Sequence, residues 1–171
     1  MGMRHLLLSV TLVGVLANGA EAARPACTTS AEREAMTVRA FQSYLMVAAV
    51  ACNQATAYNG FVTRFQPELA ASGQRLKGYF QRVYGGNAEK SLNDYITGLA
   101  NAWSQVHMAN MGGYCAATWE TMWRLGKGSP DRAALMTYVS GKSADPAVAG
   151  ELCSGASVPQ VAAAAPAPSV R

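Results

Sequence analysis

The chain has 171 residues and carries 14 basic and 10 acidic side chains, which gives a formal net charge of +4 at pH 7. The basic residues are scattered and form no dense stripe, so this composition excludes nucleic acid as the expected partner. The length is sufficient for one domain that buries a hydrophobic core without help from a metal ion or a second chain.

Residues 1–22 have the pattern of a cleavable signal peptide. Arg4 supplies a positive charge before an apolar run from Leu6 to Ala17, and Ala20-Glu21-Ala22 provides the small residues that signal peptidase accepts. The run is shorter than the about 20 residues that a helix needs to cross a hydrocarbon core. We therefore expect cleavage before Ala23, a periplasmic or secreted location, and no transmembrane span in the mature chain.

Residues 23–155 predict a single all-α domain, a helical bundle of about four to six helices with two disulfides. Thr29 and Glu32 form a capping box that opens the first helix, which is expected to end near Cys52. The apolar positions that recur at helical intervals in this segment are Met36, Ala40, Phe41, Tyr44, Leu45, Val47 and Ala48.

A second helical pattern contains Tyr58, Phe61, Val62, Phe65 and Leu69. Pro67 cannot donate a backbone hydrogen bond, so either the helix is kinked there or a new helix begins at this proline. The continuing pattern contains Leu76, Tyr79, Phe80 and Val83 and is expected to stop at Gly85-Gly86.

Asn87 is predicted to cap the next helix. The apolar positions of that helix are Leu92, Tyr95, Ile96, Leu99, Trp103 and Val106. Met111-Gly112-Gly113 predicts a turn, followed by a helix over residues 116–125 that contains Trp119, Met122 and Trp123.

Two proline-containing segments predict short helices further along the chain. Ser129 is predicted to cap a helix whose first residue is Pro130 and which runs through Val139. Asp145-Pro146 predicts a further turn or two. Residues 156–171 are rich in Ala and Pro and contain almost nothing large to bury, so we expect a disordered tail.

The cysteines are Cys27, Cys52, Cys115 and Cys153, and an even number of cysteines in an exported chain predicts disulfides. A continuous helix would hold Cys27 and Cys52 about 35 Å apart, whereas bridged Cα atoms lie within about 7 Å of each other. This pair is therefore disfavoured. The preferred pairing is Cys52–Cys115 with Cys27–Cys153, and the alternative is Cys27–Cys115 with Cys52–Cys153.

His107 is the single histidine of the predicted mature chain, because His5 belongs to the signal peptide. Any histidine-dependent nucleophilic mechanism must use it, and a Cys/His zinc site would compete with the disulfides.

Trp103, His107 and Met111 are spaced at i, i+4 and i+8, and Met108 lies beside them. Imidazole, thioether and indole groups together suit Cu(I), so these four residues form a hypothetical copper site. The competing interpretation is that Trp103, Met108 and Met111 fill the core, with His107 at its rim.

No active-site pattern is present in the sequence. The acidic residues Glu68, Glu89, Asp94, Glu120 and Asp131 are scattered, and the glycine pairs lack a phosphate-binding continuation. The aromatic residues Tyr58, Phe61, Phe65, Tyr79, Phe80, Tyr95 and Trp103 either fill a helical core, which is the favoured interpretation, or line a pocket for an apolar ligand. The sequence therefore predicts no enzyme and no cofactor.

The function that these observations favour is that of a non-enzymatic, exported helical accessory or binding protein, for example a subunit of an envelope assembly. Its expected partner is another envelope or secreted protein. The alternative is a carrier that holds a small apolar ligand or lipid between its helices, and a Cu(I)-binding protein is the third hypothesis. A filled core with an apolar patch on the outside favours the first function, whereas the carrier needs an apolar cavity of roughly 300–1,000 Å³.

Overall fold

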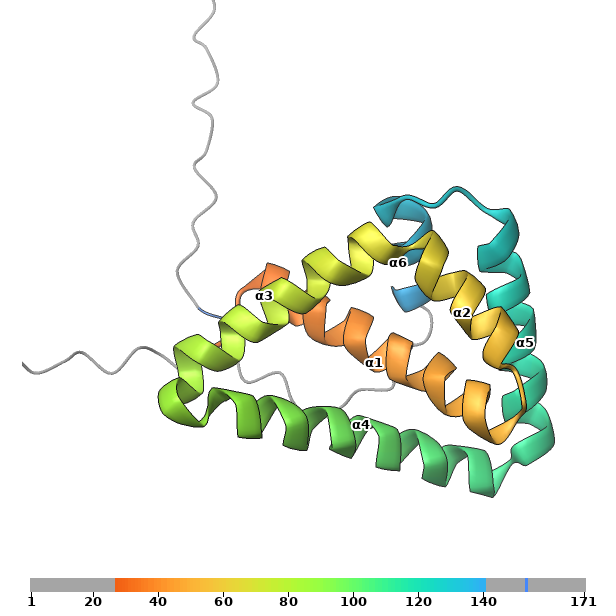
Figure 1. Ribbon diagram of the computed structural model, residues 1–171, viewed down its shortest axis with the longest axis horizontal. Helices are drawn as coiled ribbons and strands as arrows, with labels where there is room; N and C mark the ends of the chain where they lie inside the picture. The colour runs from red at the N-terminus through yellow and green to blue at the C-terminus, as the bar shows by residue number, and fades with distance from the viewer. Residues whose placement is uncertain (1–26, 141–152, 154–171) are drawn as a thin grey trace, which may run out of the picture.

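The computed structural model describes residues 27–140 and Cys153. This part of the chain is all-α, as predicted (Figure 1). Its elements are α1 (Ser30–Ala51), α2 (Ala55–Arg64), α3 (Gln66–Tyr84), the 3-10 turn η1 (Gly85–Asn87), α4 (Ala88–Ala109), α5 (Met111–Lys127) and α6 (Arg132–Ser140). In Figure 1, α3, α4 and α5 outline a triangle, and α1 runs across its middle.

The central helix α1 contacts each of the other described α-helices. Its buried residues surround the helix instead of forming one stripe: Ala35, Met36, Val38, Ala40, Phe41, Ser43, Tyr44, Leu45, Val47, Ala48 and Ala49. A helix that is apolar on all sides is typical of a protein interior. The predicted capping box is present, since the Glu32 N–H donates to Thr29 Oγ1 at 3.2 Å and the Thr29 N–H donates to Glu32 Oε2 at 2.8 Å.

A helix boundary separates α2 from α3, so the second segment is not one kinked helix. Phe65 ends α2, and its N–H donates to the Phe61 oxygen at 3.0 Å. Pro67 lies in the first turn of α3, where the backbone N–H groups have no acceptor within the helix and a missing N–H is tolerated. Gly85 ends α3 with a φ of 53°, a conformation that favours glycine.

One capping bond and two helix starts differ from the sequence prediction. Asn87 lies at the N-cap position of α4, as predicted, but its side chain makes no capping hydrogen bond. Asp131, and not Ser129, caps α6, because its Oδ1 accepts the Ala134 N–H at 2.9 Å. Met111-Gly112-Gly113 is the first turn of α5 and not a loop.

Asn110 explains why a helix begins at two adjacent glycines. It is the single residue between α4 and α5, and its Oδ1 accepts the Gly113 N–H at 3.1 Å. A Cβ atom at position 113 would lie 2.4 Å from Nδ2 of Asn110, so glycine lets this cap form without displacement. The two long helices therefore meet at a sharp corner (Figure 1).

The buried apolar side chains form two clusters along α1. The larger cluster contains Val38, Phe41, Tyr44, Leu45, Val47, Ala48, Phe61, Phe65, Trp103, Tyr114, Met122, Leu125, Leu135 and Val139. The smaller cluster contains Ala35, Met36, Leu76, Tyr79 and Phe80. Each of the seven aromatic residues considered above belongs to one of these clusters or packs against it. They are core residues, as the favoured interpretation had it.

The disulfides have the preferred pairing, Cys27–Cys153 with Cys52–Cys115, and not the alternative that the helix between Cys27 and Cys52 also allowed. The Cα atoms of Cys27 and Cys153 are 4.9 Å apart, and those of Cys52 and Cys115 are 5.6 Å apart. The first bond joins the residues just before α1 to a point beyond α6, where the Cys153 N–H also donates to the Thr28 oxygen at 3.0 Å. The second joins the end of α1 to the first part of α5.

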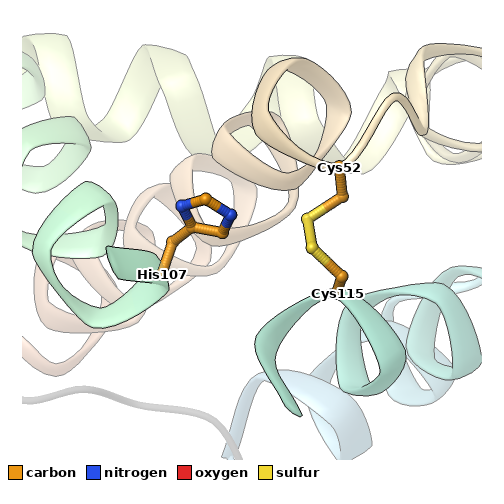
Figure 2. A group of neighbouring side chains, drawn as sticks. All are labelled: Cys52, His107 and Cys115. Carbon is orange, nitrogen blue, oxygen red and sulfur yellow. A yellow bond between two sulfur atoms is a disulfide. The ribbon is translucent and has the colours of Figure 1, made fainter. Parts of the chain in front are cut away.

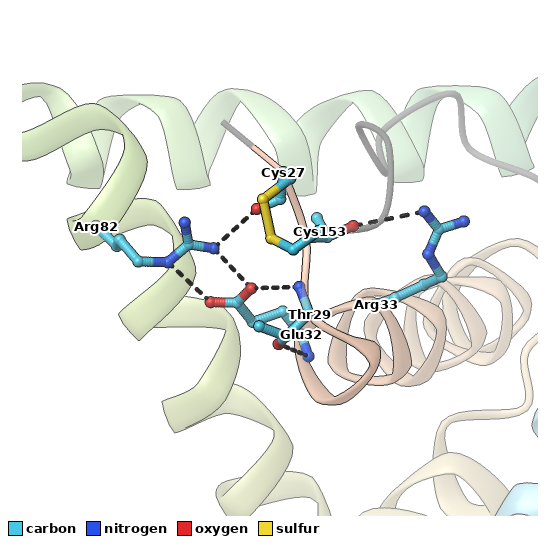
Figure 3. Close-up of a disulfide and its surroundings, with 7 residues drawn as sticks. Cys27, Thr29, Glu32, Arg33, Arg82 and Cys153 are labelled. Carbon is cyan, nitrogen blue, oxygen red and sulfur yellow. Dashed lines mark hydrogen bonds and ion pairs between the residues drawn. A yellow bond between two sulfur atoms is a disulfide. The ribbon is translucent and has the colours of Figure 1, made fainter. Parts of the chain in front are cut away.

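An ion pair reinforces the Cys27 end of the molecule (Figure 3). Arg82 of α3 donates to both carboxylate oxygens of Glu32, at 3.1 and 2.6 Å, and to the Cys27 oxygen at 3.0 Å. Burial acts to raise the pKa of Glu32, but the hydrogen bonds from Arg82 and Thr29 outweigh it, and the pKa lies below its ordinary value. Arg82 thus fastens α3 to the capping box of α1.

Several predictions fall on other parts of the chain. The expected signal peptide (residues 1–22), the turn at Asp145-Pro146 and the tail (residues 156–171) lie outside the described residues. Within the described residues, no helix has the length and apolar character needed to cross a lipid bilayer.

Candidate functional site

A groove of about 790 Å³ runs between α2 and α5. It is lined by Ala57, Asn59, Gly60, Phe61, Thr63, Arg64, Trp119, Met122, Trp123, Gly126 and Lys127. Its floor is apolar because Phe61 and Met122 are core residues, 2% and 3% exposed. The groove lies open on the surface and is not an enclosed internal cavity.

Hydrogen bonds fasten the two walls of this groove at both ends. At one end, Nε2 of Gln54, just before α2, donates to the oxygen of Cys115 at 2.8 Å, beside the Cys52–Cys115 disulfide. At the other end, Arg64, the last residue of α2, donates to the oxygen of Gly128, just beyond α5. The two helices therefore run in the same direction, and the groove between them is preformed.

Trp119 and Trp123 form the exposed edge of the groove. They are 55% and 53% exposed, although the apolar pattern grouped them with the buried Met122. Threonines occupy the buried face of α5 in their place: the hydroxyl of Thr118 donates to the Tyr114 oxygen at 2.9 Å, and that of Thr121 donates to the Ala117 oxygen at 2.7 Å. A hydroxyl that bonds to its own helix in this way tolerates burial, and this leaves the tryptophans on the outer face.

One end of the groove is basic. Arg64 and Lys127 both line it, and the lining contains no acidic residue. The Lys127 ammonium lies 4.1 Å from the centroid of the Trp123 ring, a cation–π contact that holds the charge beside the apolar surface. The groove thus presents an apolar floor, an aromatic edge and a positive end.

The hypothetical copper residues do not share one face, because α4 ends before Met111, the first residue of α5. Met108 and Met111 are 70% and 61% exposed, so neither fills the core. Trp103 is buried, and its Nε1 donates to the Ala40 oxygen at 3.0 Å. His107 is buried as well, and faces a different neighbour.

The imidazole of His107 lies beside the Cys52–Cys115 disulfide (Figure 2). One imidazole nitrogen of His107 and the two Sγ atoms all lie within 4.8 Å of one another. The side chain is 9% exposed, and within the described residues its Nε2 has no hydrogen-bond partner. The ring also packs edge-on against Tyr114, with centroids 5.5 Å apart. No spacing in the sequence indicates this cluster, since its members come from α1, α4 and α5.

The acidic residues considered as catalytic groups do not gather around the groove or around His107. Asp94 forms an ion pair with Lys90 at 2.5 Å, and Glu120 pairs with Arg124 at 2.7 Å, each one turn apart on its own helix. Asp131 caps α6. These three carboxylates therefore have local structural roles.

Comparison with models of protein families, with curated proteins and with solved structures finds no match to this chain. Two features of its own geometry are suited to binding: the α2–α5 groove and the cluster of His107 with the Cys52–Cys115 disulfide.

Proposed function

We propose that this chain is a non-enzymatic, exported binding protein that holds an apolar segment of another exported protein in the α2–α5 groove. The observation that carries the proposal is the pair Trp119 and Trp123, both more than half exposed beside an apolar floor. Large aromatic side chains gathered at one exposed apolar site are typical of surfaces that a partner covers. Tryptophan is also among the residues most enriched at the energetic centres of protein interfaces.

The open form of the groove favours a protein segment as its occupant. Sites for small molecules usually enclose most of the ligand surface, whereas an amphipathic helix lies in an open groove and inserts side chains from one face. The hydrogen bonds at the two ends of the groove hold its walls in place before binding, which lowers the entropic cost of association.

Charge indicates how the partner is oriented. Lys127 and Arg64 are both at the end where α2 and α5 terminate, with no acidic residue in the groove lining. A partner segment with an acidic residue at that end would complement them, and complementary charges set orientation more than affinity.

Two disulfides in a chain of this size support a location outside the reducing cytosol. The predicted signal peptide supports export by an independent route. A periplasmic or secreted location, with a partner that is itself an envelope or secreted protein, is therefore part of the proposal.

A lipid carrier is the second candidate, and the size of the groove is the observation that favours it. The volume of about 790 Å³ lies within the range of roughly 300–1,000 Å³ that ligand pockets occupy. An acyl chain against Phe61, with an anionic head group near Lys127, would use the same surface.

Photo-crosslinking in the cells that make the protein tests the proposal. A photoreactive amino acid is placed at Thr63, an exposed groove residue, and, as a matched control, at Thr97, an exposed threonine of α4 outside the groove. We expect a protein adduct from position 63 only, and its loss in the variant Trp123→Ala. Equal adducts at both positions, or an adduct that Trp123→Ala leaves unchanged, would contradict the proposal. A lipid adduct at position 63 would establish the carrier instead.

A further inference from the structure

The cluster of His107, Cys52 and Cys115 has the donor atoms of a metal site. An imidazole nitrogen and two sulfurs lie within 4.8 Å of one another (Figure 2). Zinc binds thiolate sulfur at about 2.3 Å and imidazole nitrogen at about 2.0–2.1 Å, so ligand atoms on one tetrahedral ion are about 3.5–3.8 Å apart. With the S–S bond open, we expect side-chain rotations to bring the three donors to that spacing, since they already lie within 4.8 Å of one another.

The imidazole provides an independent indication. His107 is nine-tenths buried, and its Nε2 has no hydrogen-bond partner in the described part of the chain. A buried polar nitrogen without a partner is costly, and such exceptions are uncommon in folded proteins. A metal ion bound through this imidazole would remove that cost.

The positions of the two cysteines do not depend on the disulfide alone. Gln54 lies two residues after Cys52, and its Nε2 donates to the backbone oxygen of Cys115 at 2.8 Å. Its backbone N–H donates to the Ala49 oxygen at 3.1 Å. Gln54 is itself buried, so water competes weakly for these bonds. They keep the end of α1 beside α5 when the S–S bond is broken.

Tyr114 holds α5 in the same way. Its hydroxyl donates to a backbone oxygen of α1 at 2.6 Å, and its ring packs against His107. The three donor residues are therefore kept close by hydrogen bonds and packing that remain in the reduced protein.

We propose that reduction of the Cys52–Cys115 disulfide creates, with His107, a Cys₂His site for Zn²⁺. The reductant is a dithiol: it passes two electrons and two protons to the disulfide, which becomes two thiols, and the dithiol becomes a disulfide. Both cysteines are partly exposed, so a reductant has access to them. Zn²⁺ then displaces the two thiol protons to solvent and takes the lone pair of the neutral imidazole, with water as its fourth ligand.

The ligands of the proposed zinc site differ from those of the hypothetical copper site, because its two sulfur ligands are cysteine thiolates and the methionines take no part. It is also independent of the groove and of the partner that the groove binds. In the oxidised protein the sulfurs are bonded to each other and the site is closed, so metal binding reports the redox state of the chain.

The test uses the full exported chain, reduced with a dithiol and desalted without oxygen. Co²⁺ is titrated first, because thiolate ligation gives it strong sulfur-to-metal absorption, and Zn²⁺ is then added in competition. We expect one tight site in the reduced protein and none in the oxidised protein. The variant Cys27→Ser/Cys153→Ser should keep the site, and Cys52→Ser/Cys115→Ser should lose it.

His107→Gln separates a true three-ligand site from simple thiol binding. We expect Zn²⁺ affinity to fall by at least about tenfold, together with a changed visible spectrum of bound Co²⁺. Circular dichroism of the reduced protein should show that the helices persist. Equal binding in the oxidised protein, an unchanged affinity and spectrum in His107→Gln, or loss of the helices on reduction would each overturn the proposal.

Discussion

The hydroxyl of Tyr114 donates a hydrogen bond of 2.6 Å to the backbone oxygen of Tyr44. Both side chains are buried, and their rings meet edge-on with centroids 5.1 Å apart. Burial raises the pKa of Tyr114 far above its ordinary value, so the hydroxyl remains a donor at any physiological pH. This bond ties the first turns of α5 to the middle of the central helix α1.

Tyr114→Phe should therefore destabilise the protein by about 1 kcal/mol, since a buried hydrogen bond is lost while the ring stays in place. Urea denaturation followed by circular dichroism measures the change. Tyr58→Phe is the matched control, because the Tyr58 hydroxyl makes no hydrogen bond within the described residues and its loss should have little effect. Equal effects of the two substitutions would show that the bond to Tyr44 contributes nothing.

Glu32→Gln should destabilise the protein in a pH-dependent way. The pKa of Glu32 is lower in the folded protein than its ordinary value, so its ionised form stabilises the fold above the ordinary glutamate pKa of about 4.3. That stabilisation is lost as the pH falls from there through the folded pKa. We expect a difference of about 1 kcal/mol at neutral pH, a modest value because water partly screens the pair with Arg82.

The measurement is the free energy of unfolding of wild type and Glu32→Gln between neutral pH and strong acid. The gap between the two curves should close in acid. Glu89→Gln, at an exposed glutamate with no ion pair among the described residues, should give parallel curves. If the difference in unfolding free energy stayed constant into strong acid, the charge of Glu32 would not contribute to stability, and the effect of the substitution would come from packing or hydrogen bonding.

Variants with a single tryptophan should differ in their accessibility to acrylamide. Trp103 is buried in the larger cluster, whereas Trp119 and Trp123 line the open groove. In each variant the other two tryptophans are replaced by phenylalanine, and quenching of the remaining fluorescence is measured. We expect the quenching constant of Trp103 to be several-fold smaller than that of either groove residue. Similar constants at all three positions would contradict the exposure of the groove.

Removal of the two disulfides should have unequal costs. The bonds close loops of 63 and 126 residues, so in the chain-entropy model Cys52→Ala/Cys115→Ala costs about 4 kcal/mol and Cys27→Ala/Cys153→Ala about 5 kcal/mol. Chemical denaturation of each double variant against the oxidised wild type gives the two values. A much larger cost for the Cys52–Cys115 pair would show that this bond also determines the packing of α1 against α5.

Some features that depend on neighbouring residues were predictable from the sequence, although the local caps of α5 and α6 were not. Thr29 and Glu32 are three residues apart and interact within one turn, so tertiary structure has little influence on their capping box. The length of the helix between Cys27 and Cys52 excluded one of the three possible disulfide pairings, but it did not decide between the other two. The boundary at Pro67 was one of two open possibilities, and the first turn of a helix is where proline costs least.

The candidate sites depend on tertiary contacts that no local pattern contains. Trp119 shares an apolar pattern with Met122, but another face of α5 is buried, and the hydroxyls of its threonines donate to the helix's own backbone there. The i, i+4, i+8 spacing around His107 assumed one continuous helix. The corner at Asn110 breaks that helix and separates Met111 from the histidine.

Because α1 is buried on all sides, it can pack completely only after the helices that cover it have been synthesised. The helix is near the beginning of the described chain, yet the surfaces that cover it belong to α2, α3, α4, α5 and α6, which are synthesised later. Before α5 has been synthesised, Tyr44 has no Tyr114 to pack against. A shorter nascent chain therefore exposes the apolar surface of α1, which is prone to aggregation. The core around α1 can therefore be completed only after α5 has been synthesised. This late completion of the core is compatible with the proposed export of the chain, because a secretion channel takes its cargo unfolded.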